Sequence, residues 1–249
     1  MMKKIINRFL EIFGYRVSKI KTYNFHHIFK KFEKSHNNVI IDVGSNRGQS
    51  IEDFLKIYTN YEIHCFEPLN NLHEELKDKY NDNRNIYLNN YALGDENKDS
   101  KFFKYHNDVN SSFNKPISGS NWEKKKKRIF NKENLIKEEL KVKILKLDDY
   151  VKINNLKFID LLKIDTQGYE DKVLNGSTEI LKSNKINFIQ LEFIMGNQYE
   201  DRLNIIDYEN HLIKNNFRLY GINQKGDLLT KSDISLDLLY ANSNNIPVK

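Results

Sequence analysis

The chain has 249 residues, of which 39% are hydrophobic, and a net charge of +6 from 40 basic and 34 acidic side chains. That length suffices for one α/β domain with a full central sheet and a modest extension. The sequence has no run of about 18 apolar residues, which excludes a transmembrane helix. Its single cysteine, Cys65, excludes an intrachain disulfide. We therefore expect a soluble protein of the reducing cytoplasm.

Residues 1–36 are predicted to form a helical N-terminal extension, and residues 37–249 the main domain. Apolar side chains recur at helical spacing in residues 1–14, and a second helix is predicted at 25–34. We expect the first helix to pack on the main domain; contact with a membrane surface is the alternative. The segment has no small-residue cleavage site, so a signal peptide is not expected.

The most informative segment is Val39–Gly48, VIIDVGSNRG, together with the acid Glu67 nineteen residues after Gly48. Aliphatic residues that end in Asp42 predict a buried strand. Gly44 and Gly48 predict a tight turn into a helix, which would leave backbone N–H groups exposed. An acid that closes the next strand is placed to accept hydrogen bonds from two ribose hydroxyls. The pattern predicts a cofactor that contains a nucleoside.

The spacing of this loop distinguishes between two cofactors. A dinucleotide-binding loop has the pattern G-x-G-x-x-G, and the middle glycine is missing from Gly44-Ser45-Asn46-Arg47-Gly48. Asp42 would also repel a pyrophosphate, whereas it suits the amine and the sulfonium of S-adenosylmethionine. We therefore favour S-adenosylmethionine; a dinucleotide and a loop of purely structural role are the alternatives.

Strands and helices alternate through the main domain, which predicts a mostly parallel sheet with helices on both faces. The predicted strands are 38–43, 61–66, 86–91, 158–165, 187–193, 217–222 and 236–241, and the predicted helices include 49–57, 72–80 and 208–215. Ligands of such sheets bind beyond the carboxyl ends of the strands. The last two strands are expected to pair through a turn near Gly226.

Residues 97–145 interrupt the alternation and are predicted to form a cap that binds the acceptor. The elements expected in this cap are a strand at 101–105, a polar loop at 110–120, a charged helix at 122–140 and a strand at 142–147. The helix contains the cluster Lys124–Arg128. For this cluster we favour a solvated face over contact with nucleic acid, anionic lipid or an acidic glycan.

Seven motifs follow one another across residues 38–242. They are IIDVGSNRGQS, CFEP, NYALGD, LKLDDY, LLKIDTQGYEDKVLNGS, QLEF and DLLYAN. In this order they resemble the FkbM-type methyltransferases, a family of S-adenosylmethionine-dependent enzymes. The resemblance implies a Rossmann-like class I methyltransferase fold, in which a seven-stranded sheet ends in an antiparallel hairpin. It also implies O-methylation of a hydroxyl on a sugar, a glycan or a small-molecule metabolite.

Two features depart from the pattern of this family. Gln167 stands where many members have glutamate, which questions any role that needs a charge there. The lysine-rich stretch 122–143 matches no part of the pattern, so the resemblance implies no particular acceptor.

The residues expected to contact the cofactor lie at the ends of predicted strands. They are Asp42, Gly44, Ser45, Asn46 and Gly48 for the methionyl part, Glu67 and Pro68 for the ribose, and Ala92 and Leu93 for the adenine. Methyl transfer is an in-line displacement at the carbon of a sulfonium. The protein is therefore expected mainly to align the acceptor and exclude water.

An alcohol is a weak nucleophile, so a base or a metal must lower the cost of losing its proton. Asp165 ends the strand expected beside the first strand and is the favoured base; a helix-capping role is its alternative. Glu192 and Glu170 are the next catalytic candidates, although Glu170 in a first helical turn also has a structural explanation. No metal site is predicted; a divalent cation between Asp165 and Glu192 is the alternative.

Two histidines and two serines are weaker candidates. His64, inside a predicted strand, is expected to be structural, and His106 in the insertion is an alternative base. Ser111 and its neighbour Ser112 are alternatives for contact with acceptor hydroxyls, against ordinary loop polarity.

Two other functions compete with O-methylation. An N-methyltransferase would need only a weak base, because an amine is the better nucleophile. A non-catalytic methyltransferase-like module would bind nucleic acid through the basic insertion, but few aromatic side chains are interleaved with its lysines. The sequence indicates no oligomeric state.

Overall fold

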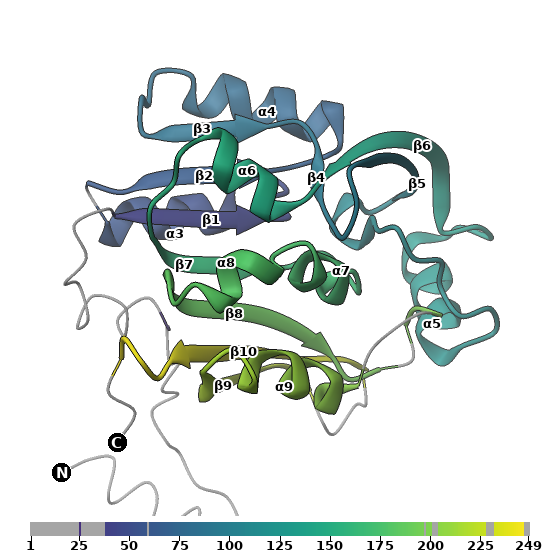
Figure 1. Cartoon of the computed structure of the whole chain (residues 1–249). Coiled ribbons are helices and arrows are strands. Elements are labelled where there is room, and N and C mark those ends of the chain that lie inside the picture. Colours follow the sequence, from purple (N-terminus) through teal and green to yellow (C-terminus); the bar gives the residue numbers. More distant parts are fainter. Residues whose placement is uncertain are drawn as a thin grey trace, which may run out of the picture.

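The computed structural model describes residues 25, 38–58, 60–196, 198–200, 204–227 and 232–246. A large central sheet has helices on both faces, and a smaller sheet lies beyond the carboxyl ends of its parallel strands (Figure 1). The helices predicted at 1–14 and 25–34 lie outside the described residues, apart from Phe25, which packs in the core. Within the described part of the chain, no helix is long and apolar enough to cross a membrane.

The central sheet has seven strands in the order β3-β2-β1-β7-β8-β10-β9. They are β1 (Val39–Val43), β2 (Glu62–Phe66), β3 (Ile86–Asn89), β7 (Ile159–Ile164), β8 (Ile186–Ile194), β9 (Phe217–Asp227) and β10 (Ser232–Asn242). The first five strands in this order, β3, β2, β1, β7 and β8, are parallel. Strand β10 runs antiparallel to both β8 and β9. This topology confirms the predicted sheet and its antiparallel C-terminal hairpin.

Each face of the sheet has its own apolar core, because successive side chains of a strand point to opposite faces. On one face Ile40 and Leu161 pack with the helices α3 (Gln49–Ile57) and α4 (Asn70–Tyr80). On the other face Ile41 and Leu162 belong to the core that includes side chains of four further helices. These are α6 (Leu147–Ile153), α7 (Glu170–Asn175), α8 (Thr178–Lys182) and α9 (Ile205–Ile213).

The insertion forms a second sheet of three strands in the order β4-β6-β5. Its elements are β4 (Ala92–Leu93), β5 (Lys98–Tyr105), the 3-10 helix η2 (Asp108–Asn110), α5 (Asn121–Phe130) and β6 (Ile136–Leu145). We call the part from residue 97 to residue 145 the cap. It lies beyond the carboxyl ends of β1, β7 and β8 (Figure 1).

The predicted helix at 122–140 is wrong in its second half. The helix ends at Phe130, because Asn131 adopts a left-handed backbone with φ of +50°. The following residues alternate between core and solvent, with Leu140, Val142 and Ile144 directed inward, and β6 pairs with β5. A two-residue apolar period was therefore mistaken for the continuation of a charged helix.

Candidate active site

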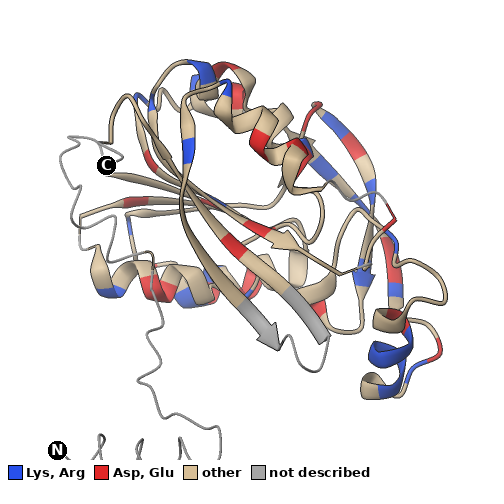
Figure 2. Cartoon of the chain, turned by 90° about the horizontal axis from the view of Figure 1, so that it is seen from below, with Lys and Arg blue, Asp and Glu red and all other residues tan. Residues whose placement is uncertain are grey.

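A cavity of about 620 Å³ opens at the carboxyl ends of the strands, where the strand order reverses between β1 and β7. This is the position at which parallel α/β sheets bind ligands, and the volume is typical of a small-molecule site. The cap closes one side of the cavity with Phe102, Asp108, Val109, Ser111 and Phe113. The basic helix α5 contributes no lining residue; its lysines lie at the outer end of the cap (Figure 2).

Two glycines give the loop after β1 its shape. Gly44 has a φ of +83°, and a Cβ atom there would lie 2.0 Å from the backbone oxygen of Asp165. Gly48 has a φ of +81°, and a Cβ atom would lie 3.0 Å from side-chain atoms of Leu76 and Tyr80. Only glycine combines this backbone with such close neighbours. The loop therefore brings β1 directly against the end of β7.

The expectation that this loop exposes its N–H groups is wrong. The N–H groups of Gly44 and Ser45 both donate to the oxygen of Phe66, at 3.0 and 3.1 Å. The N–H of Asn46 donates to Glu67 Oε2 at 2.9 Å, and that of Gly48 to the oxygen of Ser45 at 2.8 Å. A pyrophosphate needs free donors, and these N–H groups are already bonded. The loop therefore does not fit a dinucleotide.

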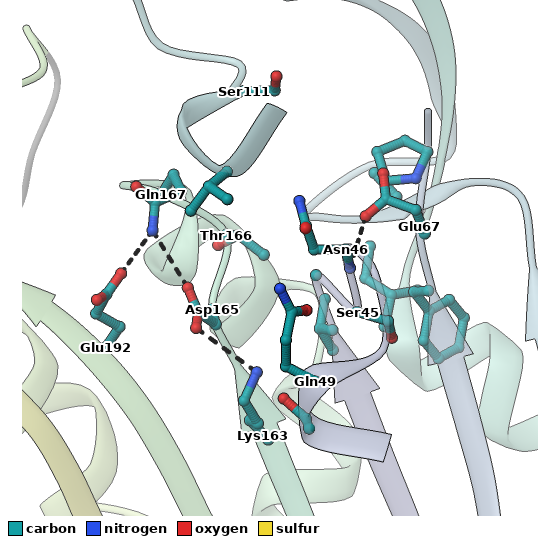
Figure 3. Close-up of a pocket in the computed structure, with 18 of the residues that line it drawn as sticks. Ser45, Asn46, Gln49, Glu67, Ser111, Lys163, Asp165, Thr166, Gln167 and Glu192 are labelled. Carbon is teal, nitrogen blue, oxygen red and sulfur yellow. Dashed lines mark hydrogen bonds and ion pairs between the residues drawn. The ribbon is translucent and has the colours of Figure 1, made fainter. Parts of the chain in front are cut away.

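Glu67 lies on the cavity wall with its carboxylate held by the backbone (Figure 3). Its Oε1 accepts from the N–H of Leu69 and its Oε2 from the N–H of Asn46, both at 2.9 Å. Burial raises the pKa of Glu67 to about 7, although the two N–H donors act in the opposite direction. Each carboxylate oxygen has a second lone pair, so the side chain remains able to accept hydrogen bonds from two hydroxyls.

Asp42 does not line the cavity, contrary to its predicted contact with the cofactor. It is fully buried, and its Oδ1 accepts a hydrogen bond from Lys163 Nζ at 3.1 Å. Asp42 and Lys163 are direct partners in the β1–β7 register, which places both side chains on the same face. Lys163 lines the cavity, and its Nζ also lies 3.6 Å from Asp165 Oδ2.

Asp165 and Glu192 line the opposite wall and are joined by an amide (Figure 3). Gln167 Nε2 donates to Asp165 Oδ1 at 3.3 Å and to Glu192 Oε2 at 2.7 Å. The amide oxygen of Gln167 accepts from the hydroxyl of Tyr199 at 3.3 Å. An uncharged side chain at position 167 thus bridges two acids, which a third carboxylate could not do without a proton.

Two cap side chains form hydrogen bonds with the backbone of the turn after β7, which carries Gln167. Ser112 Oγ donates to the oxygen of Gln167 at 2.8 Å, and Asn114 Nδ2 donates to the oxygen of Gly168 at 2.6 Å. Gln167 adopts a left-handed backbone with φ of +57°, which is uncommon for a residue other than glycine. The cap therefore helps to maintain the conformation that directs the Gln167 amide at the two acids.

Glu170 is buried but does not line the cavity. Its carboxylate accepts from the N–H and the hydroxyl of Thr166 and from the N–H of Gly168. Burial raises its pKa to about 7. Its hydrogen bonds close the turn after β7. Of the three catalytic candidates, Asp165 and Glu192 are the two that line the cavity.

The other predicted residues divide into two groups. Those that line the cavity are Gly44, Ser45, Asn46, Pro68, Ala92, Leu93 and Ser111, and Gly48 does not line it. His64 lies away from the cavity, where its Nδ1 is 2.7 Å from the hydroxyl of Tyr150 and its ring stacks on Tyr87. His106 is also absent from the lining.

Several lining residues were not foreseen. They are Phe25, Gln49, Ser50, Asp53, Asp108, Val109, Lys163, Thr166, Gln190, Asn223 and Asp237, among others. A pattern for part of this set exists in the sequence. Gln190 and Glu192 are two residues apart on β8 and so face the same side. Lys163 near the end of β7 and Asp165 just beyond that strand have the same spacing. An alternation of polar residues at a strand's carboxyl end would have indicated both pairs.

The charge of the lining favours a cation. Among the described lining residues there are six carboxylates, those of Asp53, Glu67, Asp108, Asp165, Glu192 and Asp237, and one cationic side chain, that of Lys163. With the loop N–H groups bonded as well, the cavity suits a ligand that contains a sulfonium and an ammonium better than a phosphate ester. No cluster of three or more His, Cys, Asp or Glu arranged for a metal ion occurs among the described residues.

Residues 42–219 match the model of the methyltransferase FkbM domain. The chain belongs to the FkbM methyltransferase family. A curated relative is the 2-O-methyltransferase NoeI of Sinorhizobium fredii (strain NBRC 101917 / NGR234). It is 27% identical over 165 residues, which are 66% of this chain and 67% of the relative.

Two solved structures that align with most of the chain have TM-scores below 0.5. An rRNA methylase from Streptococcus thermophilus is 10% identical, with a TM-score of 0.49, and the match covers 90% of this chain and 99% of that one. Precorrin-6y C5,15-methyltransferase from Geobacter metallireducens GS-15 is 10% identical, with a TM-score of 0.43 and coverage of 92% and 94%. As a member of the FkbM family, the protein is an S-adenosylmethionine-dependent methyltransferase, as the sequence predicted.

Proposed function

We propose that this FkbM methyltransferase methylates a hydroxyl group of a sugar, a glycan or a small metabolite, with Asp165 as the base. The observation that supports this most is the pair of acids Asp165 and Glu192 on the wall opposite Glu67, joined by Gln167. A hydroxyl needs a proton acceptor to become a nucleophile, and the pair supplies one. The relative NoeI is named as a 2-O-methyltransferase, which agrees with an oxygen acceptor.

The residues present fit S-adenosylmethionine. Glu67 would accept from the ribose hydroxyls, Ala92 and Leu93 would border the adenine, and the turn at Gly44 would adjoin the methionyl part. When bound, S-adenosylmethionine supplies an electrophilic methyl carbon and a thioether leaving group. Asp165 would take the proton of the acceptor hydroxyl, while Glu192 would bind a neighbouring hydroxyl and orient the acceptor.

The cofactor half of the proposal is tested by titration calorimetry with adenosylhomocysteine. Wild type is expected to bind with a Kd in the micromolar range, about −8 kcal/mol, and Glu67→Ala to bind at least roughly tenfold more weakly. Glu133→Ala is the matched control, because Glu133 is exposed and outside the cavity. Equal affinities of wild type and Glu67→Ala would contradict this placement of the ribose.

The acceptor half is tested by transfer of a radiolabelled methyl group to a panel of glycosides and amines, followed by NMR of the product. An O-methyl ether is the expected product. Asp165→Asn should then lower kcat by roughly 10²- to 10⁴-fold and leave the Kd of adenosylhomocysteine nearly unchanged. An N-methyl product, or a kcat that survives Asp165→Asn, would contradict the assignment of Asp165 as base.

A further inference from the structure

The proposed cofactor brings a carboxylate into an acidic cavity. The methionyl part of S-adenosylmethionine ends in both an ammonium and a carboxylate group. Six carboxylates already line the cavity, so a seventh would be repelled unless a cationic group receives it. The loop after β1 offers little compensation, because the N–H groups of Gly44, Ser45 and Asn46 are bonded to protein oxygens.

Lys163 is the cationic side chain that the described lining provides. It is only 8% exposed, and its Nζ points into the cavity between Asp165 and Gln49 (Figure 3). Among the described residues, Nζ makes one hydrogen bond, to Asp42 Oδ1 at 3.1 Å, and one longer ion contact, to Asp165 Oδ2 at 3.6 Å. An ammonium group has three donors, so Lys163 has capacity for a further acceptor.

The first turn of α3 lies beside this ammonium group. Gln49 and Ser50, the first two residues of the helix, line the same cavity. The N-terminal end of a helix favours a negative charge, and the side-chain amide of Gln49 adds a donor. The positive end of α3 and the charge of Lys163 therefore favour the same kind of group at the same place.

We propose that Lys163 binds the carboxylate of the methionyl part of the cofactor. The inference rests on the proposed cofactor site and adds a residue that holds the end opposite Glu67. It also gives Asp42 a new role, as the buried partner that positions Lys163 rather than as a group that touches the cofactor.

The surroundings of Lys163 keep it charged. Burial alone would lower its pKa, but the carboxylates of Asp42 and Asp165 outweigh burial and raise the pKa above the ordinary value for lysine. Asp42 is fully buried, so its carboxylate is available to Lys163 and not to a ligand. The lysine is therefore an ammonium ion throughout the neutral range, as a carboxylate partner requires.

The experiment compares two ligands that differ by one carboxylate. Adenosylhomocysteine and its decarboxylated analogue, 5′-deoxy-5′-(3-aminopropylthio)adenosine, are titrated calorimetrically into wild type and Lys163→Met. Wild type is expected to bind adenosylhomocysteine roughly 10- to 100-fold more tightly than the analogue. Lys163→Met should bind the two ligands within about threefold of each other, because the analogue never used the lysine.

Further variants guard against unfolding and against a general loss of charge. Lys163→Met leaves the Asp42 carboxylate buried without its partner, so the double variant Asp42→Asn/Lys163→Met is measured in parallel. Lys163→Arg keeps the cation and should retain most of the preference for adenosylhomocysteine. Lys185→Met, at an exposed lysine outside the cavity, should behave as wild type.

The outcomes separate this inference from the proposed function. If the preference persists in folded Lys163→Met, the carboxylate is bound elsewhere and the inference is overturned while the cofactor site stands. If wild type binds neither ligand, the cofactor site itself is wrong, and the inference is overturned with it. Failure to find a hydroxyl acceptor would affect only the proposed reaction, because both ligands are measured without an acceptor.

Discussion

The two walls of the cavity are built in different ways. On the nucleoside side, the Glu67 carboxylate accepts hydrogen bonds from two backbone N–H groups. One belongs to Asn46 in the loop after β1, and the other to Leu69, two residues after Glu67. On the opposite side, side chains from different strands hold one another: Lys163 binds Asp42, and Gln167 joins Asp165 to Glu192. The first wall depends on backbone donors, one from the turn that follows Glu67 and one from the loop after β1. The second wall depends on contacts between side chains of neighbouring strands and of the turn after β7. A single substitution should therefore have different consequences on the two sides.

The junction of the two walls gives the largest expected effect. Gly44→Ala places a Cβ atom against the backbone oxygen of Asp165, in a backbone region that alanine disfavours. We expect it to lower the free energy of unfolding by about 4 kcal/mol or more, measured by urea denaturation. Gly119→Ala is the control, since Gly119 also has positive φ but no atom within 4 Å; it should cost only about 1 kcal/mol. Equal losses would show that the contact with Asp165 is unimportant.

The nucleoside wall should respond to pH through Glu67. Its pKa is about 7 because of burial, and only the carboxylate form has acceptors for both ribose hydroxyls. The affinity for adenosylhomocysteine should therefore fall as the pH drops below about 7, approaching tenfold per pH unit, and should be constant above that pH. Calorimetric titrations between about pH 5.5 and pH 8.5, a range that brackets the pKa of Glu67, would measure how this affinity depends on pH.

Two variants assign this pH dependence to its group. Glu67→Gln should bind weakly at every pH and show a flat profile. Glu170 is a matched control, because its pKa is also about 7 but it does not line the cavity. Glu170→Gln should therefore keep the pH profile of wild type. A profile that survives Glu67→Gln and disappears in Glu170→Gln would mean that the ribose is not bound where we place it.

The opposite wall should respond to the loss of its bridge. Gln167→Leu removes both donors, and Gln167→Glu adds a third carboxylate between Asp165 and Glu192. Each is expected to lower kcat/KM for the acceptor by roughly 10- to 100-fold, with the Kd of adenosylhomocysteine changed less than about threefold. Gln167→Glu should regain activity at lower pH, when protonation of the introduced glutamate lets it donate a hydrogen bond to a neighbouring acid. Gln167→Leu should not, because leucine has no donor at any pH.

The amide of Gln167 is itself held by Tyr199, which allows a milder test. Tyr199→Phe removes a hydroxyl whose single proton is shared between the Gln167 amide oxygen and the Asn110 oxygen, and it should lower kcat/KM by only about 2- to 10-fold. Identical kinetics for wild type and all three variants would show that the bridge does not position the acids.

The smallest effect is expected where the cap meets the nucleoside wall. Arg47 forms ion pairs with Glu75 on α4 and with Asp108 of the cap, but its side chain is half exposed. Arg47→Met should therefore change the free energy of unfolding by less than about 1 kcal/mol, as Arg84→Met should at an exposed position without ion pairs. A clearly larger loss would show that the cap depends on this contact.

The comparison of the walls also explains what the sequence could predict. The sheet and the glycine turn follow from residues that are neighbours in the chain and were predicted. The position of Glu67 at the cavity was predicted from its place at the end of a strand. Asp165 was foreseen from its place at a strand end. Lys163 was missed, and Asp42 was assigned a ligand contact, because only the β1–β7 register shows that the two side chains pair. Such partners lie more than a hundred residues apart in sequence.

The cap was likewise predicted only in part from the sequence. Its place in the chain, at the ligand edge of the sheet, was predictable from the interruption of the strand and helix alternation. Its fold was not, because the apolar period changes from helical in α5 to extended in β6 without a glycine or proline between Phe130 and Ile136. The lysines of α5 do not line the cavity; the cap lines it with Phe102, with η2 and with residues that follow η2.

Two cap side chains, Ser112 and Asn114, hydrogen-bond to the turn that carries Gln167. The rest of the cap is built on its own small sheet, continuous with the main domain through β4 and β6. The cap also packs on the main domain, where Leu69, Leu72, Ile194 and Tyr199 belong to the same apolar clusters as cap side chains. Asp108 and Val109 line the cavity but belong to neither cluster. Substitutions at these two positions would therefore change the space open to an acceptor while the packing of the cap and the two hydrogen bonds that fix the turn are kept.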